Sequence, residues 1–91
     1  MKACPVINGG VVIGHCIYCS GCEQYHIFTA GVWQFNGDYE NPTFSPSLLC
    51  NKDYPDIRCH SFVRDGSIQF LPDCYHKLAG QTVPLPENDW C

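Results

Sequence analysis

Hydrophobic positions along the chain fall in short runs separated by Gly, Pro, Asn and Asp, and no long segment has the 3.6-residue period of a helix. Residues 11–18, 25–30 and 32–35 are rich in β-branched and aromatic side chains, which is typical of strands. Residues 41–47 contain two prolines, too many for a central strand, so we expect an ordered surface loop there. The pattern predicts a mainly β fold.

The clearest element is a hairpin in which residues 57–64 and 67–71 flank Asp65-Gly66, a pair suited to a two-residue turn. This turn places Val63 opposite Ile68 and Ser61 opposite Phe70. Because side chains alternate between the two faces of a strand, the more apolar face is expected to point to the core. That face carries Cys59, Ser61, Val63, Ile68, Phe70 and Pro72. The outer face carries His60, Phe62, Arg64, Ser67, Gln69 and Leu71.

The rest of the chain predicts one short helix and two extended ends. Asp73 is a good helix N-cap, residues 74–79 could form one or two turns, and Gly80 would end them. With 91 residues, the chain is long enough for one domain. We therefore expect a single domain over residues 1–91, with an N-terminal arm at 1–10 and an extended C-terminal tail at 82–91.

Eight cysteines and four histidines provide the reinforcement that so small a core needs. The N-terminus lacks the long apolar run of a signal peptide, and no membrane span is expected. These observations predict a reducing cytosol, where clustered cysteines bind metal more often than they form disulfides. A disulfide-stapled structural protein is the alternative.

The charge distribution disfavours nucleic acid as a partner. The net charge is −4, and the five Lys and Arg residues are scattered without forming a basic patch. Asp38, Glu40, Asp53 and Asp56 fall in one central stretch. This stretch is either a solvated loop or a docking surface for a basic partner.

A metal site is predicted from two cysteine pairs. Cys19 and Cys22 form a C-x2-C turn, and the hairpin register brings Cys59 and Cys74 to its open end. Four thiolates would complete a tetrahedral, closed structural zinc site. His26 or His76 is the most plausible replacement for one cysteine.

The other cysteines are expected to stand outside this site. Cys16 also lies three positions before Cys19, but the full iron–sulfur pattern is absent. Cys4, Cys50 and Cys91 have no partner at ligand spacing and are expected to be unpaired.

A catalytic alternative uses His26, His60, Asp73 and His76 as an open zinc site that activates water for hydrolysis. The simpler interpretation is that Asp73 caps a helix while the histidines orient cysteines or fill polar gaps. The zinc-deaminase and H-E-x-x-H motifs are both absent from the sequence.

The second half of the chain resembles a family of small uncharacterised proteins found in phages, prophages and bacterial mobile regions, often mislabelled "ammonia monooxygenase". The resemblance is carried by residues 41–49 (NPTFSPSLL), 59–71 (CHSFVRDGSIQFL), 73–76 (DCYH) and 78–86 (LAGQTVPLP), and it extends over about residues 18–86. Ser20 stands where many relatives have Pro, a departure that leaves the turn intact.

The resemblance selects Cys19, Cys22, Cys59 and Cys74 as ligands and implies a bacterial host cytosol. Some relatives occur near ubiquitin-like conjugation genes, which implies protein partners. We therefore expect a zinc-stabilised module that binds a protein through residues 38–47 and the acidic stretch to Asp56, and that inhibits a host defence complex.

Overall fold

The computed structural model describes all 91 residues and is built from strands alone. The strands are β1 (Cys4–Asn8), β2 (Val11–Cys19), β3 (Gln24–Thr29), β4 (Gln34–Phe35), β5 (Phe44–Cys50), β6 (Cys59–Arg64), β7 (Ser67–Phe70) and β8 (Thr82–Pro84). The predicted mainly β class is confirmed. There is no helix, and so none that could cross a membrane.

The short helix predicted at residues 74–79 is wrong. That segment forms separate turns, with bonds from Cys74 N–H to the Leu71 carbonyl and from Ala79 N–H to the His76 carbonyl. The intervening Tyr75 N–H donates to the carbonyl of Arg58, in the approach to β6. The Ala79 N–H therefore bonds three residues back and not four, and the i→i−4 bonds of an α-helix do not form.

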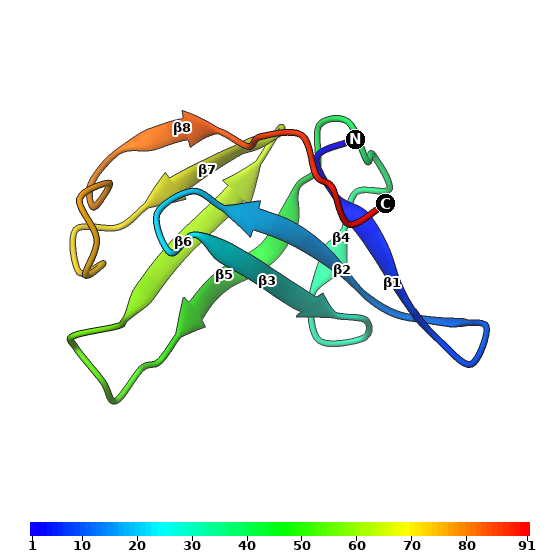
Figure 1. Cartoon of the computed structure of the whole chain (residues 1–91), viewed down its shortest axis with the longest axis horizontal. Coiled ribbons are helices and arrows are strands. Elements are labelled where there is room, and N and C mark those ends of the chain that lie inside the picture. Colours follow the sequence, from blue (N-terminus) through cyan, green and yellow to red (C-terminus); the bar gives the residue numbers. More distant parts are fainter.

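Two antiparallel sheets pack against each other around the core (Figure 1). The smaller sheet has the order β1-β2-β3 and the larger has the order β4-β5-β6-β7-β8. Side chains from both sheets share one buried cluster, to which Ile17 and Phe28 contribute from the first sheet and Val63 and Phe70 from the second. The ring of Phe28 stacks on Phe44 of β5 with a centroid separation of 4.1 Å, which joins the two sheets directly.

The segment expected to be a surface loop is instead partly an inner strand, because β5 pairs with β4 on one side and β6 on the other. The register along β6 shifts between Phe44 and Leu48, where three β5 residues face a single β6 residue. Pro46 lies inside this irregularity, where a missing N–H breaks no ladder bond. The prediction failed because a bulge lets a sheet accept a proline that a regular inner strand would exclude.

The hairpin prediction is confirmed residue for residue: Val63 pairs with Ile68 and Ser61 with Phe70 across β6 and β7. The buried face also matches, since all four of these side chains are at most 1% exposed. His60 therefore lies on the outer face of the larger sheet. The expected strand at 32–35 is shorter than predicted and is limited to β4.

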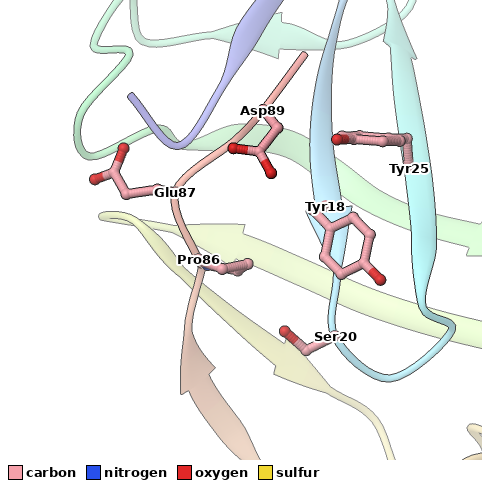
Figure 2. A pocket seen from close by; sticks show the side chains of 6 residues that line it. All are labelled: Tyr18, Ser20, Tyr25, Pro86, Glu87 and Asp89. Carbon is pink, nitrogen blue, oxygen red and sulfur yellow. The ribbon is translucent and has the colours of Figure 1, made fainter. Parts of the chain in front are cut away.

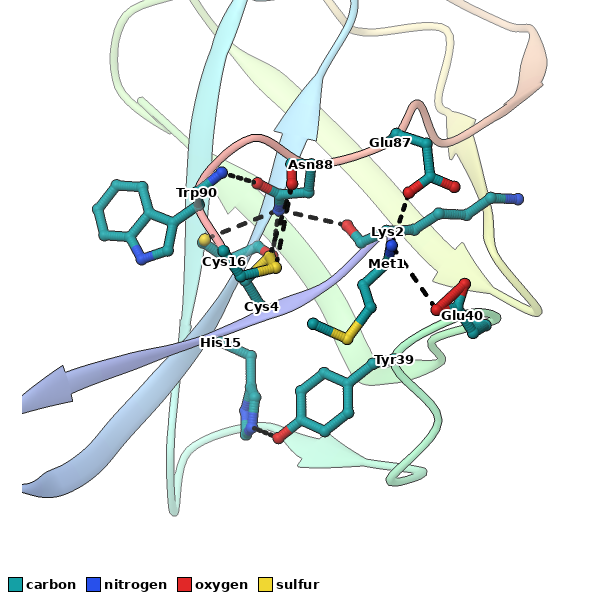
Figure 3. The surroundings of a disulfide bond; sticks show 11 residues. Met1, Lys2, Cys4, His15, Cys16, Tyr39, Glu40, Glu87, Asn88 and Trp90 are labelled. Atoms are coloured by element: carbon teal, nitrogen blue, oxygen red, sulfur yellow. Dashed lines mark hydrogen bonds and ion pairs between the residues drawn. A yellow bond between two sulfur atoms is a disulfide. The ribbon is translucent and has the colours of Figure 1, made fainter.

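The two ends of the chain are joined by a disulfide between Cys4 and Cys91 (Figure 3). The expectation that both cysteines are unpaired is therefore wrong. The C-terminal segment returns to the smaller sheet. The Asn88 N–H donates to the carbonyl of Met1, just before β1, and the Asn88 side chain donates to the carbonyl of Cys16 in β2. The other six cysteines are free thiols, so a disulfide-stapled fold describes the chain ends only.

Candidate functional site

Three thiols and one imidazole form the only cluster of potential metal ligands. The ligand atoms of Cys19, Cys22, Cys59 and His76 all lie within 4.8 Å of one another. They come from the end of β2, the following turn, the start of β6 and the turns after β7. Three sulfurs and one nitrogen are a common donor set for a structural zinc site, so the residues fit a tetrahedral metal ion.

His76 reaches the cluster because Gly21 leaves room for its ring. Nε2 of His76 lies 3.6 Å from the Cys59 sulfur, and the Leu78 N–H donates to Nδ1 at 3.2 Å. A Cβ atom at Gly21 would collide with the imidazole. The C-x2-C turn therefore supplies two thiols and also the space through which the fourth donor enters.

Cys74, the fourth cysteine expected at the metal, lies outside the cluster. Its thiol donates to the carbonyl oxygen of His60 at 3.1 Å and accepts the N–H of His60 at 3.2 Å. His76, which the sequence offered as a possible replacement, occupies the fourth position. Cys74 instead fixes the backbone of His60.

The cluster favours negative charge on one sulfur. Hydrogen bonding with Cys59, supported by His26, lowers the pKa of Cys19 to about 4 against the opposing effect of burial. Hydrogen bonding with Cys19 and burial both raise the pKa of Cys59. Burial, followed by the charge of Cys19, raises the pKa of Cys22. A thiolate at Cys19 beside two protonated thiols is a starting point for metal capture with proton release.

His26 lies next to Cys19 but is not one of the four members of the cluster. Its Nδ1 lies 3.7 Å from the sulfur of Cys50, and the ring is only 5% exposed. Burial lowers the pKa of His26, but hydrogen bonds with Cys19 and Cys50 outweigh it and raise the pKa to about 10. His26 therefore supports Cys19 as a neighbouring polar group.

A second constellation lies on the outer face of the larger sheet. The hydroxyl oxygen of Ser47 lies 3.3 Å from Nε2 of His60, and Nδ1 of His60 lies 3.5 Å from a carboxylate oxygen of Asp73. Each ring nitrogen thus faces a different partner. A hydroxyl on Nε2 and a carboxylate on Nδ1 is the arrangement in which an imidazole activates a serine nucleophile.

The strands explain why these three side chains meet. Ser47 is the last residue of the bulge in β5, His60 is the second residue of β6, and Asp73 follows the end of β7 by three positions. Ser47 and His60 are partly exposed and the Asp73 side chain is 42% exposed, so solvent and ligands can reach them. Bulges often re-aim a side chain beside an active site, and this one contains Ser47.

The four residues considered for an open zinc site do not meet at one point. His76 belongs to the metal cluster and His26 lies behind it, whereas His60 and Asp73 face Ser47. Sequence reasoning missed Ser47. The available signal was the outward position of His60, which places its ring beside the outward side chains of the neighbouring strand.

Two surface hollows lie elsewhere. A pocket of about 390 Å³ between β2, β3 and the C-terminal segment is lined by Tyr18, Ser20, Tyr25, Pro86, Glu87 and Asp89 (Figure 2). It contains no member of the metal cluster or of the Ser47 constellation. A smaller hollow of about 200 Å³ includes Ser45 and Thr43, and Ser45 is two residues before Ser47 on the same strand.

Comparison with known proteins yields one family. The family model described as "Bacterial ubiquitination-like system serine protease (BubE)" matches residues 6–71, which is well over half of the chain. The chain belongs to the BubE family. The region matched to BubE includes Ser47 and His60 and ends two residues before Asp73. No curated protein and no solved structure matches the chain.

Proposed function

We propose that this protein is a serine protease in which Ser47 is the nucleophile, His60 the general base and Asp73 the residue that orients His60. The observation that carries the proposal is the sequence of two contacts, from Ser47 Oγ to His60 Nε2 and from His60 Nδ1 to Asp73. The description of the BubE family as a serine protease supports the same chemistry independently of these distances.

The mechanism follows from the positions of the protons. Nε2 of His60 removes the hydroxyl proton as Ser47 Oγ attacks the carbonyl carbon of a peptide bond. The resulting imidazolium then gives this proton to the leaving amine, and an acyl ester remains on Ser47. A water molecule, deprotonated by the same nitrogen, hydrolyses the ester and restores the hydroxyl group.

The distances from His60 to Ser47 and to Asp73 are compatible with an enzyme that has no substrate bound. Both contacts are slightly longer than an ideal hydrogen bond, and catalytic contacts commonly shorten when substrate binds. Asp73 holds Nδ1 protonated, so that the lone pair of Nε2 faces Ser47. Because the Asp73 carboxylate is partly exposed, water screens its charge, and its contribution should be smaller than that of a buried aspartate.

Zinc has a structural role in this proposal, held by Cys19, Cys22, Cys59 and His76. Four protein donors close the coordination sphere, which is the composition of a structural site. Cys59 immediately precedes His60, and His76 follows Asp73 by three residues. The metal would thereby anchor the two segments that carry the base and its orienting carboxylate.

A protein substrate replaces the binding partner expected from the sequence. The family description names a ubiquitination-like system, so proteins of such a system are the substrate class it supports. Inhibition of a host defence complex and a phage origin stay predictions, and no contact described above favours them.

A fluorophosphonate probe, which reacts with activated serines, tests the proposal. Intact-mass and peptide analysis should place one adduct on Ser47, and Ser47→Ala or His60→Ala should abolish it. Ser45→Ala is the matched control, because Ser45 is an exposed serine two positions earlier on the same strand and should not affect labelling. Absence of an adduct on the folded protein, or an adduct on Ser45, would refute the assignment.

A further inference from the structure

The backbone of Leu49 presents both of its polar groups away from the neighbouring strand β6. Leu49 is paired with His60 in the register of β5 and β6. The N–H of His60 donates to Cys74 and its carbonyl accepts from Leu71, so both groups of His60 point to the far side of β6. In an antiparallel ladder such a pair exchanges no hydrogen bonds, and the polar groups of Leu49 therefore also point outward.

No strand covers β5 at this position. β4 pairs only with Phe44 and Ser45, and it is the outermost strand of the larger sheet. Between β4 and Leu49, the indole N–H of Trp33 donates to the carbonyl of Ser47 at 3.4 Å. The edge of β5 is therefore open at Leu49 and closed by a side chain at Ser47. The Leu49 side chain is 41% exposed, which agrees with an uncovered edge.

We propose that the open edge of β5 at Leu49 binds the substrate as an added antiparallel strand, so that the enzyme cleaves extended peptide segments. This inference rests on the proposed function of Ser47. The occupant is an extended peptide because the edge offers one N–H and one carbonyl, which only another peptide backbone satisfies together. All strand pairs of this sheet are antiparallel, and an antiparallel residue opposite Leu49 would exchange both bonds with it.

The pairing fixes which bond is cleaved. An antiparallel peptide runs from Leu49 towards Ser47, so its N-terminal part lies beside Leu49 and the scissile carbonyl lies near the nucleophile. Leu49 is two residue steps along the strand from Ser47, about 7 Å, and the same spacing applies to the substrate. The residue that pairs with Leu49 is thus the one two positions before the residue whose carbonyl is attacked. Trp33 ends the pairing at Ser47, where the substrate must leave the edge.

Tripeptide boronic acids test the binding mode, because boron bonds to an activated serine whereas the peptide part reports on the edge. The probe is acetyl-Ala-Ala-Ala in which boron replaces the last carboxyl group. N-methylation of the first alanine removes the N–H that would bond to Leu49 and should weaken inhibition about tenfold. N-methylation of the middle alanine is the matched control, since its N–H points away from β5, and it should change inhibition less than about twofold.

Variants of Leu49 test the same contact from the enzyme side. Leu49→Pro removes the outward N–H at an edge where proline is tolerated, and it should weaken the unmodified tripeptide about tenfold. Leu49→Ala keeps the N–H and should have an effect of less than about threefold. Fluorophosphonate labelling needs Ser47 and His60 but no peptide strand, so it reports separately whether each variant keeps a reactive serine.

The outcomes separate the two proposals. Labelling of Ser47 by the fluorophosphonate, together with equal inhibition by all three tripeptides, would overturn the edge proposal and leave the serine mechanism standing. Absence of any labelling of Ser47 would overturn the mechanism and the edge proposal with it. Should Leu49→Pro fail to fold, the N-methylated tripeptides decide the question on the unchanged protein.

Discussion

Nε2 of His60 lies 3.3 Å from the hydroxyl oxygen of Ser47, although 13 positions separate the two residues in the chain. The contact depends on two features of neighbouring strands: a bulge in β5 that carries Ser47 and a regular hairpin that turns His60 outward. With Asp73 on the opposite nitrogen, the imidazole is held between a hydroxyl and a carboxylate. The first two predictions concern these three side chains.

Removal of the nucleophile should abolish turnover without unfolding the protein. Ser47→Ala deletes one partly exposed oxygen atom, so we expect its free energy of unfolding to stay within about 0.5 kcal/mol of the original. Peptide hydrolysis should fall to background. Urea unfolding and a fluorogenic peptide assay measure the two effects, and residual hydrolysis above that of His60→Ala would exclude Ser47 as nucleophile.

Removal of the orienting carboxylate should have an intermediate effect. Asp73→Asn removes the negative charge that faces Nδ1 of His60, and a buried aspartate in this role accounts for about 10⁴-fold in kcat. Because Asp73 is partly exposed, we expect a loss of about 10- to 1,000-fold, largely in kcat. Asp65→Asn, an exposed turn aspartate, is the control. An unchanged kcat in Asp73→Asn would show that His60 is oriented by other groups.

Metal analysis should find one zinc ion per chain in protein purified without chelator. Cys59→Ser should reduce the zinc content by at least half and destabilise the protein, because a structural zinc contributes to folding. Cys74→Ser is the matched control, because Cys74 is also a buried free thiol but lies outside the cluster. This variant should keep its zinc. Loss of zinc from Cys74→Ser but not from His76→Ala would reverse this ligand assignment.

A single methyl group at Gly21 should disturb the metal site. In Gly21→Ala the new Cβ occupies the space of the His76 ring, and a ring held by a metal cannot move aside without losing its bond. We expect weaker zinc retention, measured by competition with a chromophoric chelator. Ser20→Ala, at the exposed neighbouring position, should behave like the unchanged protein. Equal retention by both variants would argue against His76 as a ligand.

Reduction of the terminal disulfide should lower stability and leave the catalytic residues reactive. Cys4 and Cys91 close a loop with a sequence separation of 87 residues, and links of this kind commonly contribute about 2–4 kcal/mol. Cys91→Ser should therefore lower the free energy of unfolding by about that amount in urea, whereas fluorophosphonate labelling of Ser47 in native buffer should persist. The unchanged protein under reductant should match the variant, and a difference between them would point to an effect of the substitution itself.

Local patterns predicted the elements whose geometry is local. The Asp65-Gly66 turn determined the hairpin register, and with it the outward position of His60. Ser47 was missed because its contact with His60 depends on which strands are neighbours and on a bulge, and neither feature is encoded in a short window. The sequence offered His76 only as a substitute ligand. The expected helix would have pointed its side chain in a different direction from the turns that the structure shows.

Long-range features of the chain ends were also beyond a local analysis. Cys4 and Cys91 have no motif in common, and their sulfurs meet because β1 pairs with β2 while Asn88 draws the C-terminal segment onto the same strands. Spacing rules identify ligands only within one turn, as at Cys19 and Cys22. Partners from opposite ends of a chain are brought together by the completed fold.

Cys59 is adjacent to His60 in the chain, and His76 lies three residues after Asp73, so the proposed enzyme would respond to inhibitors in an unusual way. Withdrawal of the metal would release both segments that hold the imidazole and its carboxylate, and hydrolysis would stop although no bond is made or broken at the metal. A crude inhibitor panel would then show sensitivity to both chelators and serine-directed phosphonates. Inactivation by a chelator, the customary sign of a metalloprotease, would here report the loss of a scaffold.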